Sequence, residues 1–121
     1  MTTNNATSAR SVVEKFEQAL DRSDVDQAVG LMTDDCTFEA SWGGGSGTTY
    51  VGREAIRECF QMLFDQPGGM QFVEEEPAIM SDDRVVTRWH IGSGEDILRG
   101  VDVYRVSGDK IAEKLTYTKR D

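Results

Sequence analysis

Cysteine and histidine are scarce in this chain of 121 residues, which has two cysteines and a single histidine. Two cysteines without a CxxC pair provide no disulfide framework. We therefore expect Cys36 and Cys59 to be buried and reduced, which fits a reducing cytoplasm. The acidic run Glu74–Glu76 has no histidine or aspartate cluster at ligand spacing beside it, so we expect no metal site.

Long apolar runs and clustered basic residues are also missing. No apolar stretch approaches the roughly 20 residues that span a bilayer. The opening segment MTTNNATS has neither the basic start nor the apolar run of a signal peptide. The formal net charge is −9 at pH 7, which opposes binding to phosphate-rich partners because they require clustered Lys and Arg. We expect no nucleic-acid partner and no membrane partner.

The composition that remains is typical of one soluble globular domain. Hydrophobic residues make up 38% of the chain and charged residues 29%, close to the usual proportions. A chain of this length can bury a core without disulfides or metals. We expect residues 1–8 to form a disordered tail and residues 9–121 to form a single domain.

Three segments in the first half of the chain have the periodicity of helices. Apolar residues recur at helical spacing over residues 9–22. A second helix is predicted from Asp24, with Gln27 as its capping partner three residues later, and it ends at Thr33–Asp35. The third helix is predicted over residues 53–65, where a Pro-Gly-Gly sequence stops it.

The rest of the sequence is mostly strand. A strand is predicted over residues 36–42, and the glycine-rich segment 43–49 that follows predicts a loop, either a solvated connection or a flap over a pocket. Four further strands are predicted over residues 70–80, 84–92, 96–106 and 110–119. Helices followed by a run of antiparallel strands indicate an α+β domain with the helices packed on one sheet face.

Polar residues recur at alternate positions on two of these strands. Arg88 and His90 are two residues apart, as are Asp102 and Tyr104, so each pair shares one face of the sheet. If the intervening turn centres near residue 95, Arg88 faces Asp102 across the hairpin. We predict that these side chains line a pocket, with His90 as a natural acid–base group near neutral pH. A structural ion pair between Arg88 and Asp102 is the alternative.

The opposite face of the same strands is predicted to be apolar. Left in water it would form a patch of the kind that usually marks an interface. Its predicted members are Val85, Thr87, Trp89, Ile91, Val101 and Val103.

Three segments resemble the nuclear transport factor 2-like superfamily and, within it, the SnoaL-like group. They read LMTDDCTFEA, YVGREAIRECF and RGVDVYRVSGDKIAEKLTY, and the resemblance covers residues 9–118. It implies a cone in which three N-terminal helices pack on a strongly curved, mostly antiparallel sheet around a cavity. It also implies a homodimer formed through the outer sheet face. Members include enzymes and proteins without catalysis, so the resemblance implies a pocket and not a reaction.

Residue by residue, the resemblance to characterised members is incomplete. The position of the catalytic base in ketosteroid isomerase corresponds to Ala40 and that of its tyrosine to Phe16, while its second aspartate is kept as Asp102. The two carboxylate positions of limonene epoxide hydrolase correspond to His90 and Thr116. Neither set of catalytic residues is complete, so neither reaction is implied.

The inward face of the last strand has two interpretations. The family comparison places Lys114 and Thr116 in the cavity, whereas an ideal two-residue hairpin would place Leu115 beside Asp102. A bulge after the turn at Gly108 would decide between them. We favour the family arrangement.

We therefore predict a pocket protein that binds a small apolar, ring-containing metabolite and performs acid–base chemistry of the isomerase, cyclase or lyase type without a cofactor. A non-catalytic module for ligand binding, dimerisation or protein interaction is the alternative. The predicted catalytic residues are His90, Asp102 and Arg88, and the predicted ligand contacts are Tyr104, Trp42, Phe16, Lys114 and Thr116.

Overall fold

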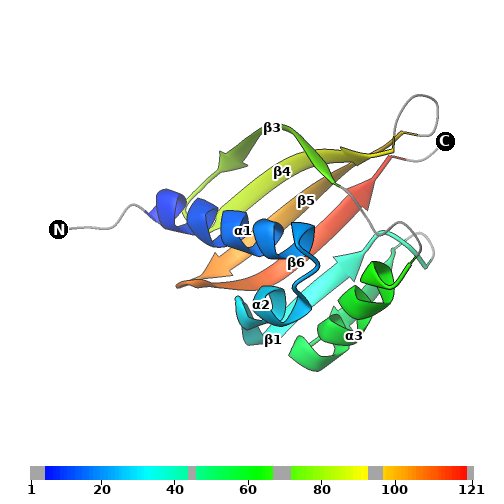
Figure 1. The fold of residues 1–121 in the computed structure, drawn as a ribbon. Coiled ribbons are helices and arrows are strands. Elements are labelled where there is room, and N and C mark those ends of the chain that lie inside the picture. The colour runs from blue at the N-terminus through cyan, green and yellow to red at the C-terminus, as the bar shows by residue number, and fades with distance from the viewer. Residues whose placement is uncertain (1–4, 44–45, 67–71, 93–96, 120–121) are drawn as a thin grey trace.

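The computed structural model describes residues 5–43, 46–66, 72–92 and 97–119, and for residues 5–8 and 76–80 it describes the backbone alone. Within these ranges the helices are α1 (Asn5–Asp21), α2 (Val25–Gly30) and α3 (Arg53–Phe64). The strands are β1 (Met32–Ala40), β2 (Thr48–Val51), β3 (Val73–Met80), β4 (Arg84–Ile91), β5 (Leu98–Ser107) and β6 (Lys110–Thr118). Figure 1 shows their arrangement.

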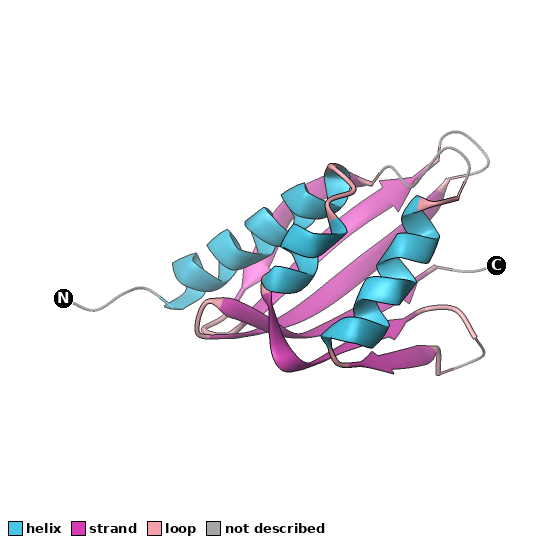
Figure 2. Ribbon diagram, turned by 60° about the horizontal axis from the view of Figure 1, so that its bottom comes forward, coloured by secondary structure: helices cyan, strands magenta, loops and turns pink. Residues whose placement is uncertain are grey.

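The strands form one curved, open sheet in the order β2-β1-β6-β5-β4-β3. Neighbouring strands are antiparallel except for β1 and β6, which are parallel. The helices all cover the same face of this sheet (Figure 2). The predicted α+β cone of the nuclear transport factor 2-like type is confirmed.

The first two helices agree with the sequence prediction except at their ends. Helix α1 begins at Asn5, four residues before its predicted start, so part of the predicted tail is helical, while residues 1–4 lie outside the described residues. The side chain of Asp24 accepts a hydrogen bond from the backbone N–H of Gln27 at 3.1 Å. This confirms Asp24 as the N-cap of α2, which satisfies one of the free N–H groups at the helix start.

The region around β1 differs from the prediction. Met32 to Asp35, predicted as the end of a helix, belong to β1, because the backbone there pairs with β6. Strand β2 was not predicted; Tyr50 in this strand pairs with Phe38 of β1. Both differences arise from pairing between strands, which the propensity of one segment does not encode. Of the predicted loop over residues 43–49, residues 44–45 lie outside the described residues, whereas Thr48 and Thr49 belong to β2.

The hydrophobic core lies between the helices and the inner face of the sheet. Phe16 of α1 is fully buried, and its ring centroid lies 6.0 Å from that of Phe60 on α3 and 5.9 Å from that of Tyr104 on β5. Burying each such ring contributes roughly 1.5–3 kcal/mol. Cys36 and Cys59 are buried and unbridged, as predicted.

A register shift between β5 and β6 determines which residues of β6 face inward. It follows Arg105, and beyond it Lys114 lies opposite Tyr104 and Thr116 lies opposite Asp102. The extra residue of such a bulge changes the phase of the strand relative to an ideal hairpin. The predicted inward position of Lys114 and Thr116 is confirmed.

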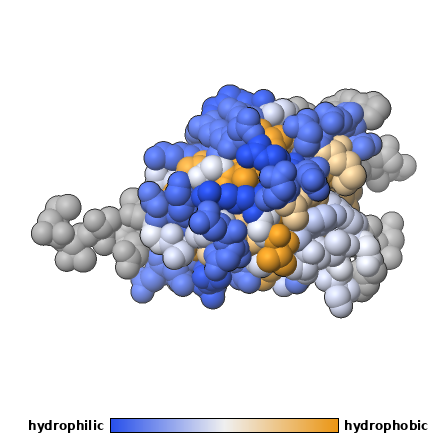
Figure 3. Space-filling model, turned by 90° about the horizontal axis from the view of Figure 1, so that it is seen from below, coloured by the Kyte–Doolittle hydropathy of each residue, from blue (hydrophilic) through white to orange (hydrophobic). Residues whose placement is uncertain are grey.

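The molecule presents a largely hydrophilic surface in the view from below, with hydrophobic side chains visible in patches between charged ones (Figure 3). In the described part of the chain, no helix is long and apolar enough to cross a membrane.

The sheet is closely packed where Trp89 of β4 meets Gly100 of β5. Trp89 and Gly100 are cross-strand partners, and a Cβ atom at position 100 would overlap the Trp89 ring. Gly100→Ala should therefore displace the indole and lower the free energy of unfolding by about 1–3 kcal/mol. Urea unfolding measures the loss, and near-ultraviolet circular dichroism reports the displaced indole.

Gly30→Ala is the matched control, because a Cβ atom at position 30 would have no atom within 4 Å and the φ of Gly30 is not left-handed. This change should leave stability unchanged or raise it by up to about 1 kcal/mol. Equal unfolding free energies for the two variants would contradict the close approach of Trp89 to Gly100.

Candidate functional site

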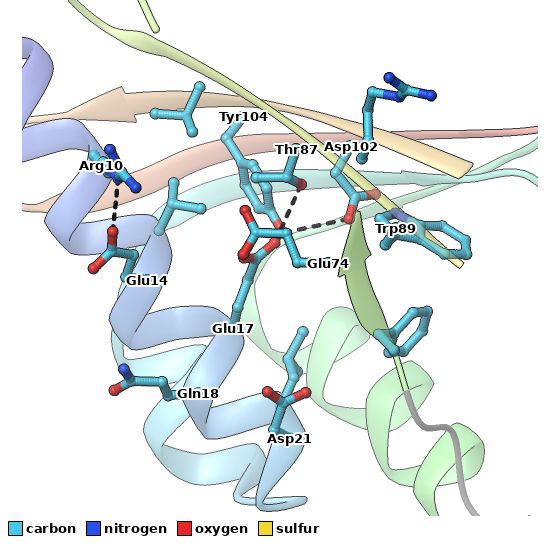
Figure 4. Close-up of a pocket in the computed structure, with 15 residues that line it drawn as sticks. Arg10, Glu14, Glu17, Gln18, Asp21, Glu74, Thr87, Trp89, Asp102 and Tyr104 are labelled. Atoms are coloured by element: carbon cyan, nitrogen blue, oxygen red, sulfur yellow. Dashed lines mark hydrogen bonds and ion pairs between the residues drawn. The ribbon is translucent and has the colours of Figure 1, made fainter. Parts of the chain in front are cut away.

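A cavity of about 290 Å³ lies between α1 and the inner face of β3, β4 and β5 (Figure 4). Its volume is near the lower end of the range for small-molecule sites, about 300–1,000 Å³. Apolar side chains such as Val13, Val85 and Phe72 line it together with carboxyl and hydroxyl groups. The cavity can therefore accommodate a molecule of one or two rings.

Two cross-strand rows of polar side chains lie on the inner face of the sheet, and Thr87, Asp102 and Tyr104 of these rows line the cavity. Thr87, Asp102 and Thr116 lie opposite one another on β4, β5 and β6. The neighbouring row places Tyr104 opposite Lys114 of β6. Because side chains alternate along a strand, both rows point to the same side of the sheet, toward α1.

Asp102 is held by a cation and a hydroxyl group. Its Oδ1 atom accepts hydrogen bonds from Lys114 Nζ at 3.1 Å and from Thr116 Oγ1 at 2.6 Å. Lys114 also donates to Thr116 at 2.9 Å and lies 4.7 Å above the ring of Phe38. Both charged side chains are less than 10% exposed. Removal of either would leave a buried charge without its partner, which is strongly destabilising.

Glu17 brings a second carboxyl group to the site from α1. Its Oε2 atom accepts hydrogen bonds from the Tyr104 hydroxyl at 3.0 Å and from Thr87 Oγ1 at 3.2 Å. Burial, with a further contribution from the charge of Asp102, raises the pKa of Glu17 to about 7, although Tyr104 and Lys114 act in the opposite direction. Glu17 therefore exchanges a proton easily near neutral pH.

The Tyr104 hydroxyl lies between the two carboxyl groups. It is 3.0 Å from Glu17 and 3.5 Å from Asp102, so its single proton bonds mainly to Glu17. Burial, and then the charges of Glu17 and Asp102, raise the pKa of Tyr104 well above its usual value. Tyr104 thus stays neutral and orients the carboxyl group of Glu17.

The predicted pairing of Arg88 with Asp102 is wrong. Thr87 lies opposite Asp102, while Arg88 lies opposite Val101. The hairpin is shifted by one residue from the predicted register, and a shift of one residue moves every side chain of a strand to the other face. Arg88 and His90 therefore alternate with the inward residues of β4, although Arg88 also contributes to the edge of the cavity.

His90 belongs to a cluster of charged side chains that is separate from Asp102. Its Nδ1 atom lies 2.9 Å from Glu75 Oε2, an oxygen that also accepts a hydrogen bond from Arg99 at 3.1 Å. Arg88 approaches the other oxygen of Glu75 at 3.9 Å. His90 and Arg88 thus contact Glu75 and do not pair with Asp102 as predicted.

The same shift changes the predicted apolar outer face. Val85, Thr87 and Trp89 are buried on the inner side, where they border the cavity. Val101 and Val103 do alternate with Asp102 and lie half-buried on the outer side, as predicted.

The predicted ligand contacts occupy different places. Tyr104 lines the cavity, whereas Phe16 is a core residue that is not among the lining residues. Trp42 donates from Nε1 to the Tyr50 hydroxyl at 3.1 Å, packs against Phe38 and is not among the lining residues. Lys114 and Thr116 face inward but act on Asp102, and neither lines the cavity.

Glu17 is the important residue that the sequence analysis did not identify. Charged residues of a helix usually form its solvated face, yet Glu17 follows Val13 by four residues and precedes Leu20 by three. Residues three or four apart lie on the same side of a helix. This spacing placed Glu17 at the edge of the apolar stripe and was the available signal.

Residues 13–114 match the SnoaL-like domain family. The chain belongs to the SnoaL-like family of the nuclear transport factor 2-like superfamily. No match was found among curated proteins.

Several solved structures have the same fold. A nuclear transport factor 2-like protein of unknown function from Mesorhizobium loti is 23% identical, with a TM-score of 0.84, and the match covers 99% of this chain and 98% of that one. A putative ketosteroid isomerase from Kribbella flavida is 14% identical, with a TM-score of 0.83 and coverage of 99% and 84%. A steroid delta-isomerase from Pseudomonas aeruginosa is 17% identical, with a TM-score of 0.74 and coverage of 93% and 80%. At these identities, the similarity establishes the fold.

The raised pKa of Glu17 predicts a pH dependence of stability. The folded-state pKa of about 7 exceeds the usual value of 4.5, so protonation favours the folded state. This contribution is fully present below pH 4.5 and is lost as the pH rises through 7. Relative to Glu17→Gln, the wild type should lose up to about 3 kcal/mol of unfolding free energy over that interval. Urea unfolding at a series of pH values measures the difference, and parallel curves for the two proteins would contradict a buried, protonated Glu17.

The neighbours of Glu17 predict opposite changes in its pKa. Tyr104→Phe removes a hydrogen bond that favours the ionised carboxyl group, so the pKa of Glu17 should rise. Asp102→Asn removes a nearby negative charge, so this pKa should fall. Titration of the Glu17 carboxyl carbon by nuclear magnetic resonance reads both changes, and shifts in the same direction would disprove the arrangement.

Proposed function

We propose that this protein binds a small, mainly apolar, ring-containing molecule beneath α1 and moves a proton on it with Glu17, in a reaction of the isomerase, cyclase or lyase type that uses no cofactor. The observation that supports this proposal is a carboxyl group that borders the cavity with a pKa of about 7. A general acid–base group works best when its pKa is near the working pH.

The surroundings of Glu17 suit a proton-transfer group. Two hydroxyl groups, those of Tyr104 and Thr87, hold Oε2, and within the described residues no hydrogen bond engages Oε1. One oxygen is thus anchored while the other is left to meet a substrate. Buried, oriented carboxyl groups of this kind accept a proton without reorganising their surroundings.

The proposed step is a proton transfer at a ring carbon beside a carbonyl group. Ionised Glu17 takes the proton, the electron pair of the broken C–H bond forms an enolate, and the negative charge resides on the carbonyl oxygen. Protonated Glu17 then returns the proton to another carbon of the same system. This sequence consumes no oxidant or reductant, and the carboxyl group returns to its ionised state.

Two similar structures bear names from the same class of chemistry, ketosteroid isomerase and steroid delta-isomerase. In this chain the base position of ketosteroid isomerase corresponds to Ala40, which is buried and cannot accept a proton. The proposed base, Glu17, therefore lies on helix α1 instead of strand β1. Asp102 and its partner Lys114 lie beside this base, and the Tyr104 hydroxyl contacts both Asp102 and Glu17.

The outer sheet face remains the proposed contact of a homodimer. Half-buried Val86, Val103 and Leu115 lie opposite one another on β4, β5 and β6, and Tyr117, which is 52% exposed, lies opposite Val101. Contiguous apolar side chains on an exposed sheet favour association with a second copy.

Deuterium exchange into a ring ketone tests the proposed chemistry. Tetralone is incubated with the protein in heavy water, and incorporation at the carbon beside the carbonyl group is followed by nuclear magnetic resonance. The wild type should accelerate exchange over buffer, with a rate that falls as the pH drops below 7, because only ionised Glu17 accepts a proton. Glu17→Gln should lower the catalysed rate by at least about 100-fold.

His90→Gln is the matched control, since His90 contacts Glu75 and does not border the cavity. It should retain wild-type exchange. Loss of exchange in this variant, or wild-type exchange in Glu17→Gln, would refute the role of Glu17. Binding of the ketone without any exchange in the wild type would favour the alternative of a non-catalytic binding module.

A further inference from the structure

Two buried side-chain atoms of the described residues have no hydrogen-bond partner: Nε1 of Trp89 and Oγ1 of Thr118. A buried polar group left without a partner costs about 1–3 kcal/mol. Such groups are rare in folded proteins, and each one calls for an explanation.

Both atoms belong to one cross-strand row. Trp89 on β4 and Thr118 on β6 each lie opposite Gly100 on β5. This row is two residues along β5 from Asp102, on the same side of the sheet. The unsatisfied polar groups thus gather at one end of the polar surface that includes the candidate site.

The Trp89 indole is held in a fixed position beside the cavity. Its six-membered ring covers Gly100, where only hydrogen can be accommodated. The ring of Phe72 packs against it at 4.9 Å, almost perpendicular. Trp89 is 7% exposed and is one of the cavity-lining residues, and Figure 4 shows it beside Asp102. Packing on both sides leaves the indole little freedom to find another partner.

We infer that the indole N–H of Trp89 recognises a hydrogen-bond acceptor, such as a carbonyl oxygen, on an uncharged ring compound bound in this cavity. The inference rests on the proposed function for the location of the ligand. Trp89 would then determine specificity, and the ligand would be an uncharged ring compound that carries a hydrogen-bond acceptor. An indole nitrogen can only donate, so its partner must offer a lone pair.

The carboxyl groups that line the cavity disfavour an anion as that acceptor. Carboxyl groups outnumber guanidinium groups in the lining, which includes Arg10, Arg88, Glu14, Glu17, Asp21, Glu74 and Asp102. Arg10 is paired with Glu14, and Figure 4 shows Glu74 next to Glu17. Asp102 already has Lys114 as its partner, and the hydrogen bonds that Glu17 accepts come from neutral hydroxyl groups. A ligand carboxylate would meet like charges, whereas a neutral carbonyl group would not.

The spacing of the site suits a ring. Thr87, which donates to Glu17, is two residues from Trp89 on β4. Two residues of a strand span about 6.6–6.8 Å. Along β4, Trp89 is therefore separated from the threonine that holds Glu17 by roughly the width of one substituted ring.

Three compounds that share a ring system test the inference: tetralin, tetralone and tetralin carboxylate. Calorimetric titration of the wild type should find tetralone bound about tenfold more tightly than tetralin, the range expected for one hydrogen bond, and the carboxylate bound most weakly. Trp89→Phe removes the N–H group but keeps an aromatic ring. It should abolish the preference for tetralone and leave the affinity for tetralin nearly unchanged.

Trp42→Phe is the matched control, because Nε1 of Trp42 already donates to Tyr50 and the residue does not line the cavity. This variant should keep the preference for tetralone. Equal affinities of the wild type for tetralin and tetralone would overturn the inference while leaving the proposed binding function intact. If the wild type binds none of the three compounds, both the inference and the proposed function fail.

A spectroscopic measurement on the wild type does not depend on the folding of any variant. Infrared absorption of carbonyl-labelled tetralone should show a lower C=O stretching frequency when the ketone is bound than when it is dissolved in a hydrocarbon, because a hydrogen bond weakens the C=O bond. In folded Trp89→Phe the frequency should return toward the hydrocarbon value. A bound frequency equal to the hydrocarbon value in the wild type would overturn the inference.

Discussion

The pairing of Thr87 with Asp102 across β4 and β5 determines which side chains enter the cavity. Side chains alternate along each strand, so this pair places Trp89 inside and leaves Arg88 to alternate with it. The bulge between β5 and β6 then brings Lys114 and Thr116 to the same side. One register and one bulge therefore assemble the polar surface that β4, β5 and β6 present to α1.

The two carboxyl groups of the site occupy different environments, and this difference separates their chemistry. Asp102 has a lysine and a threonine within hydrogen-bond distance. Glu17 has two neutral hydroxyl donors and a neighbouring negative charge, and its burial raises its pKa to about 7. Carboxyl groups with such unlike surroundings are suited to unlike roles, a partner of a buried lysine and a proton carrier.

Much of the fold could be predicted because its determinants are local. Helical spacing identified α1 and α3, the Asp24 cap marked the start of α2, and alternation identified β4 to β6. Strand β2 was missed because it depends on pairing with β1. For the site, Asp102 and Tyr104 were identified from their spacing, and the inward position of Lys114 came from the family resemblance. Arg88 and His90 were misplaced by a shift of one residue.

Local patterns in the sequence are enough to predict that the chain folds as helices on a sheet and that β5 carries Asp102 and Tyr104 on one face. Which face of β4 meets them depends on the packing of the whole chain, because an alternating pattern defines two faces without showing which one turns inward. The pKa of Glu17 also depends on the packed fold, because its hydrogen-bond partners lie 70 and 87 residues away in the chain. Burial and neighbouring charges set the pKa of a carboxyl group, and both come into being only when α1 packs on the sheet.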